Sequence, residues 1–72
     1  MTATKHIAEY DIVELAEPVD KAPAGARGGV LDIFSDGMAM VEITSLPGKM
    51  DIDRIIVAPL GKLRVVDPAP HA

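Results

Sequence analysis

Residues 30–43 read VLDIFSDGMAMVEI, and this stretch decides the fold. Two apolar runs flank the short connection Ser35-Asp36-Gly37, in which glycine can adopt a positive φ at no steric cost. The second run has the two-residue period of a strand with one buried face, because Ala39, Val41 and Ile43 alternate with Met38, Met40 and Glu42. The stretch therefore predicts a β-hairpin with strands over residues 30–34 and 38–43.

Further short strands are predicted on both sides of this hairpin. Residues 10–15 alternate in the same way, with Asp11, Val13 and Leu15 on one face, and residues 55–58 and 63–66 are compact apolar runs. Proline and glycine make residues 17–29 a long loop, and Pro-Gly at 47–48 marks a turn. Residues 59–62 fit one tight helical turn. Residues 50–54 are compatible either with an extended hairpin or with a loop.

Five short strands joined by Gly/Pro turns predict a small all-β barrel or a strongly bent sheet. With 72 residues the chain has room for a single domain, expected to span residues 1–72 with an ordered core over 7–67. Residues 1–6 are unpatterned and residues 67–72 are proline-rich, so both ends are expected to be flexible tails.

The composition argues against several classes of protein. Seven basic and 11 acidic residues give a formal net charge of −4, whereas a protein that binds nucleic-acid phosphates normally presents a basic stripe. The absence of cysteine excludes disulfides and thiolate chemistry. No apolar run is long enough to cross a membrane, and the N-terminus does not resemble a secretory signal, so a cytoplasmic location is expected.

The chemistry-bearing residues predict neither catalysis, nor a cofactor, nor a metal site. His6 and His71 lie in the expected tails, where a side chain is not held with catalytic precision. Asp51 and Asp53 could offer two oxygens to calcium, but nothing else clusters with them. The glycine-rich loop 25–29 precedes a strand rather than a helix, so its glycines are interpreted as serving a tight bend and close backbone approach rather than phosphate binding.

Protein binding is the function that the remaining residues favour. Outward-facing methionine and aromatic side chains are enriched at interfaces. The same side chains could instead form a second core layer, because strands of small barrels bend and bury residues on both faces. Asp32 already breaks the alternation, since it shares a face with Val30. The candidate partner-binding residues are Tyr10, Ile12, Arg27, Phe34, Met38 and Met40.

The order of these pieces resembles a known family. The sequence has Tyr10-Asp11-Ile12-Val13, a loop closing on Gly25-x-x-Gly28, Met40-Val41-Glu42-Ile43, Pro47-Gly48 and a terminal Leu63-Arg64-Val65-Val66. It is similar in this to an uncharacterised bacterial family, domain of unknown function 4926. The resemblance covers residues 10–66 and implies an SH3-like five-stranded small barrel, without catalytic residues to carry over. Members usually have aromatic residues where this chain has Met40 and Ile43, and residues 50–53 lack a counterpart.

The loop, glycine and strand arrangement also resembles the KOW motif of ribosomal and transcription-elongation barrels. Those modules are usually basic, whereas the loop here carries Lys21 and Arg27 among Glu17 and Asp20. We therefore expect a non-catalytic protein-interaction module, such as an antitoxin-like or immunity-like protein or an accessory subunit, that binds another protein or a second copy of itself. The alternative is a KOW-like barrel that binds nucleic acid or the ribosome.

Overall fold

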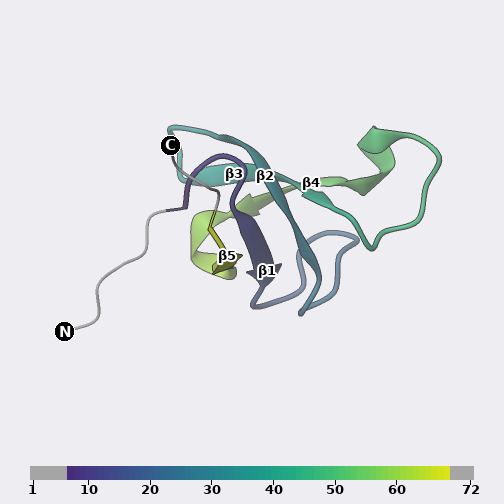
Figure 1. Ribbon diagram of the computed structural model, residues 1–72, viewed down its shortest axis with the longest axis horizontal. Helices are drawn as coiled ribbons and strands as arrows, with labels where there is room; N and C mark the ends of the chain where they lie inside the picture. The colour runs from purple at the N-terminus through teal and green to yellow at the C-terminus, as the bar shows by residue number, and fades with distance from the viewer. Residues whose placement is uncertain (1–6, 69–72) are drawn as a thin grey trace.

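Five antiparallel strands form one sheet in the computed structural model, which describes residues 7–68 (Figure 1). The order of the strands across the sheet is β4-β3-β2-β1-β5. In chain order they are β1 (Ile12–Leu15), β2 (Arg27–Ile33), β3 (Met38–Ile43), β4 (Ile55–Pro59) and β5 (Leu63–Asp67). Short 3-10 turns precede β4 (Asp51–Arg54, η1) and β5 (Leu60–Lys62, η2). The all-β fold and the helical turn before the last strand are thus confirmed.

The predicted hairpin is present, but its first strand begins earlier than expected. Strand β3 has exactly the predicted bounds, whereas β2 starts at Arg27, inside the stretch predicted as loop. Gly28 makes this possible, because a Cβ there would lie 2.1 Å from the carbonyl oxygen of Glu42 on β3. Gly28, predicted as a loop residue, is therefore a residue of β2 at a point where the backbones of β2 and β3 approach closely. Residues 50–54 form η1 rather than an extension of the hairpin.

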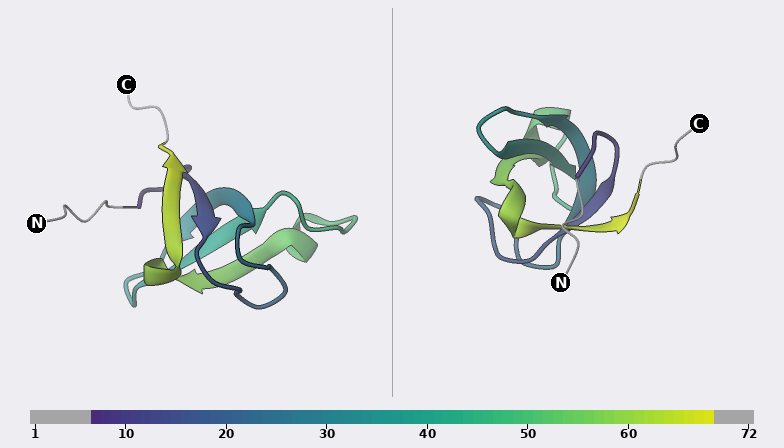
Figure 2. Two further views of the ribbon diagram at one scale, coloured as in Figure 1. Left: turned by 90° about the horizontal axis from the view of Figure 1, so that it is seen from below. Right: turned by 90° about the vertical axis from the view of Figure 1, so that its left-hand side faces the viewer.

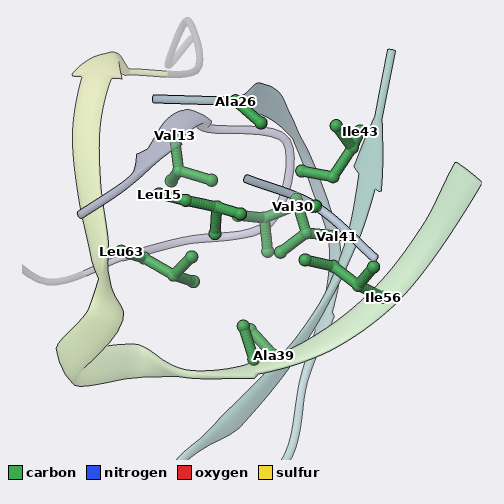
Figure 3. Close-up of a cluster of buried hydrophobic side chains, with 11 residues drawn as sticks. Val13, Leu15, Ala26, Val30, Ala39, Val41, Ile43, Ile56 and Leu63 are labelled. Atoms are coloured by element: carbon green, nitrogen blue, oxygen red, sulfur yellow. The ribbon is translucent and has the colours of Figure 1, made fainter. Parts of the chain in front are cut away.

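The buried side chains gather on one side of this sheet, which curves around them (Figures 2 and 3). The face predicted for β1 is confirmed, since Val13 and Leu15 are buried, and so is the face predicted for β3. Branched aliphatic residues dominate because their stiff side chains pack well on a pleated surface. The core consists of Val13, Leu15, Ala22, Ala26, Val30, Ala39, Val41, Ile43, Ile56, Ala58 and Leu63.

The loop between β1 and β2 also contributes to the core. Val19 and Ala22 exchange two backbone hydrogen bonds of 2.9 Å, which folds the loop into a narrow bridge. Ala22 and Ala26 are buried as a result, so the loop covers one end of the cluster of aliphatic side chains. Of the tails predicted at residues 1–6 and 67–72, residues 1–6 and 69–72 lie outside the described residues. The placement of Asp67 in the tail is wrong, because it is the last residue of β5. Within residues 7–68 no helix is long and apolar enough to span a membrane.

Candidate partner-binding surface

Two β-bulges flank the first residue of β1 and turn aliphatic side chains outward. Between β2 and β3, Val30 pairs with Val41 and Asp32 with Met40, which leaves Leu31 as the extra residue. Between β1 and β5, Val13 pairs with Val65 and Ile12 with Asp67, which leaves Val66 as the extra residue. Leu31 is 36% exposed and Val66 is 37% exposed. A bulge re-aims side chains in this way, and bulges are enriched next to functional sites.

Tyr10 lies beside these bulges in an unusual backbone conformation. Its φ is +73°, in the left-handed region that non-glycine residues seldom adopt. Its N–H donates to the carbonyl oxygen of Val30 at 2.7 Å, next to Leu31, and the residue is 70% exposed. The conformation costs about 1–2 kcal/mol, and the exposed ring recovers little of this by packing. Strain of this kind at an exposed aromatic residue favours a binding role for its side chain.

Asp11 holds the turn that presents Tyr10. The residue is 97% buried, and its carboxylate accepts the N–H of Ala8 at 2.9 Å, while its own N–H donates to the carbonyl oxygen of Ala8 at 3.2 Å. The next residue, Ile12, is 37% exposed, and its Cδ1 would lie 3.8 Å from a Cβ on Gly29. Because Gly29 has no side chain, the side chain of Ile12 lies next to the backbone of β2. We call Tyr10, Ile12, Leu31 and Val66 the β1 patch.

The six predicted partner-binding residues are separated into groups by the structure. Tyr10 and Ile12 belong to the β1 patch. Phe34, Met38 and Met40 are half-buried along β3 and the turn before it, and Met40 lies opposite Val57 of β4. Sequence reasoning missed Leu31 and Val66, because they are exposed by bulges rather than by alternation. The broken alternation at Asp32 was the available signal for the first bulge.

Arg27, the sixth predicted residue, is engaged in an ion-paired row across β2, β1 and β5. Glu14 accepts hydrogen bonds from Arg27 Nε at 3.4 Å and from Arg64 Nη2, one on each carboxylate oxygen. The Glu14 side chain is only 18% exposed. The hydrogen bond from Arg64 outweighs the opposing effect of desolvation and lowers the pKa of Glu14 from its ordinary value of 4.5. Glu14 therefore partly neutralises both guanidinium groups, which reduces the positive charge that they could offer to nucleic-acid phosphates.

A lobe formed by residues 44–54 projects from the sheet between β3 and β4 (Figure 1). Arg54 fixes it by donating to the carbonyl oxygen of Gly48 at 2.7 Å and to Asp51 Oδ1 at 2.8 Å. The carboxylate of Asp53 accepts the N–H of Met50 at 3.1 Å. The two aspartates considered for calcium thus have partners within the lobe, and residues 7–68 contain no group of three potential metal-ligating acids or histidines.

The free edge of β4 is a poor template for a partner strand. Leu60 N–H donates to the carbonyl oxygen of Gly37 at 2.9 Å, so the alternating ladder turns the backbone groups of Ile55, Val57 and Pro59 away from β3. Proline has no N–H, and the N–H of Ile55 donates to the carbonyl oxygen of Ile52. Val57 is left as the donor of this edge. A single donor supports little strand addition.

Comparison of this chain with protein-family models, with curated proteins and with solved structures finds no match.

Proposed function

We propose that the sheet is an SH3-like small barrel. Three features support this class: each of the first four strands pairs with its neighbour in the chain, a 3-10 turn leads into the last strand, and that strand pairs with the first. The long connection between β1 and β2 packs alanines into the core. The same features support the proposal that the chain belongs to the family of domain of unknown function 4926, whose sequence pattern it resembles.

We further propose that the protein is a non-catalytic interaction module that binds another protein through the β1 patch. The observation that carries this proposal is that the four large apolar side chains of the β1 patch are exposed. Tyr10, Leu31 and Val66 lie at irregular backbone positions, and Ile12 is the strand residue between them. Aromatic and aliphatic residues of this kind form the centres of protein interfaces. A role as an antitoxin-like or immunity-like protein or an accessory subunit is consistent with this size and surface.

The alternative role, nucleic-acid binding by analogy with KOW barrels, has less support. Single-stranded nucleic acid requires a basic groove with stacking aromatic residues. Arg27 and Arg64 share Glu14, and Arg54 contacts Asp51 and lies 3.7 Å from Glu42. These three arginines are thus paired with carboxylates on this acidic chain. A titration of RNA at low salt separates the two roles, since phosphate binding is strongly salt-dependent.

A comparative capture experiment tests the interaction module. The wild-type protein, the patch variant Ile12→Ser/Val66→Ser and the control variant Ile52→Ser/Val57→Ser are used as baits in the same native lysate, after thermal melts establish that each is folded. We expect the wild type and the control to recover a common partner that the patch variant loses. Recovery of the same partner by the patch variant would refute the assignment of the β1 patch as the binding surface.

A further inference from the structure

We infer that the β1 patch binds a basic, apolar protein segment, that is, one in which lysine or arginine residues flank aliphatic or aromatic side chains. This inference rests on the proposed function, because it specifies the chemistry of the partner that the patch would bind. It follows from the charges that surround the patch.

Three exposed carboxylates are direct chain neighbours of patch residues. Glu9 precedes Tyr10, Asp32 follows Leu31, and Asp67 follows Val66. Asp67 also lies opposite Ile12 in the pairing of β1 with β5, and Asp32 lies opposite Met40 in the pairing of β2 with β3.

Within residues 7–68 these three carboxylates have no cationic partner, in contrast to Glu14, Glu17 and Glu42. Glu14 pairs with two arginines, Glu42 lies 3.7 Å from Arg54, and Glu17 lies 4.0 Å from Lys62. Asp32 accepts the N–H of Ile33 at 2.9 Å, which fixes its carboxylate without neutralising it. The negative charge beside the patch is therefore available to an incoming cation.

A basic, apolar segment satisfies both parts of this surface. Aliphatic side chains of the partner would cover Ile12, Leu31 and Val66, and its cations would meet the surrounding carboxylates, which favours rapid association and the correct orientation. The exposed ring of Tyr10 adds a face to which a guanidinium or ammonium group is attracted.

Other occupants meet electrostatic opposition at the same place. Nucleic-acid phosphates would approach carboxylates that no cation of the described residues neutralises. A second copy docked through the same patch would bring two sets of the three carboxylates together, since a twofold interface joins identical surfaces. Its formal net charge of −4 adds to that repulsion.

The test is an NMR titration of the ¹⁵N-labelled full chain with short acetylated peptides as probes. One probe alternates lysine with leucine, a second alternates glutamate with leucine, and a third alternates lysine with serine. We expect the lysine–leucine probe to shift the amides of residues 9–12, 30–32 and 65–67 saturably, and to bind at least about tenfold more tightly than either of the other probes at low salt.

Two isosteric variants with the same change in charge provide the matched comparison. Glu9→Gln/Asp32→Asn/Asp67→Asn removes the carboxylates beside the patch, and Glu17→Gln/Asp20→Asn/Asp36→Asn removes three carboxylates from loops. We expect the first variant to bind the lysine–leucine probe about fivefold more weakly and the second to bind as the wild type does. Equal loss in both variants would reduce the effect to net charge and would overturn the inference.

The remaining outcomes separate this inference from the proposed function. If the glutamate–leucine probe binds the patch as well as the lysine–leucine probe, the patch is a binding surface but its preference for a basic partner is refuted. If every probe leaves the patch unshifted, the inference fails, and the capture experiment still decides whether the patch binds a protein.

Discussion

Gly28 lies against the backbone of Glu42 so closely that a Cβ at position 28 would stand 2.1 Å from its carbonyl oxygen. This contact joins β2 to β3 at the point where β2 also pairs with β1, since Gly28 lies opposite both Val13 and Ile43. The sheet can bend sharply there because no side chain separates the strands.

Gly28→Ala should consequently destabilise the protein by about 2–3 kcal/mol, because the strands must separate to admit a methyl group. Gly61→Ala is the matched control, since a Cβ at position 61 meets nothing within 4 Å. We expect that change to be neutral or slightly stabilising. Urea unfolding of both variants measures the difference, and equal stabilities would contradict the close approach.

The Glu14 row makes stability depend on pH in a defined direction. The folded-state pKa of Glu14 lies below its unfolded value, so its contribution is fully present above the unfolded pKa, near 4.5, and is lost as the pH falls through the folded pKa. Glu14→Gln should be less stable than the wild type at neutral pH, and the difference should shrink in acid. Chemical unfolding at several pH values measures this, and a difference that is constant with pH would argue against the ion-paired row.

The strained conformation of Tyr10 predicts a substitution that improves stability while it removes a surface side chain. Asparagine tolerates positive φ better than tyrosine, so Tyr10→Asn should raise the free energy of unfolding by about 0.5–1 kcal/mol. The same variant should bind the captured partner more weakly. A marked loss of stability would instead show that the ring of Tyr10 packs against the fold.

Arg54 should control the rigidity of the lobe rather than the stability of the whole protein. Arg54→Ala removes the hydrogen bonds to Gly48 and Asp51, at a cost of about 1 kcal/mol. We expect faster amide exchange confined to residues 48–55, measured by NMR. Lys49→Ala is the control, since Lys49 is an exposed lobe residue without a hydrogen bond or ion pair to the rest of residues 7–68. Acceleration throughout the core would contradict a local role.

Strand positions could be predicted where apolar and polar residues alternate, as the exact bounds of β3 illustrate. The boundary of β2 was missed at Gly28 and Gly29, because glycine is a poor strand former in isolation. The close backbone approach predicted for these glycines is confirmed at Gly28, which meets the backbone of β3. Prediction failed at Leu31 and Val66, since a bulge is set by the pairing of two strands and neither strand specifies it alone. Ile12 could be assigned to the outer face because β1 follows its two-residue period. Tyr10, predicted to begin the same strand, instead lies before β1 in a left-handed conformation.

The backbone of β4 has a consequence for how the protein behaves when it is concentrated. With a proline at its end and one amide committed to the preceding turn, this edge is a weak template for fibre growth, because Val57 is its one remaining donor. Pro59→Val would restore an N–H donor at that edge, and strand addition between copies could then lead to polymerisation.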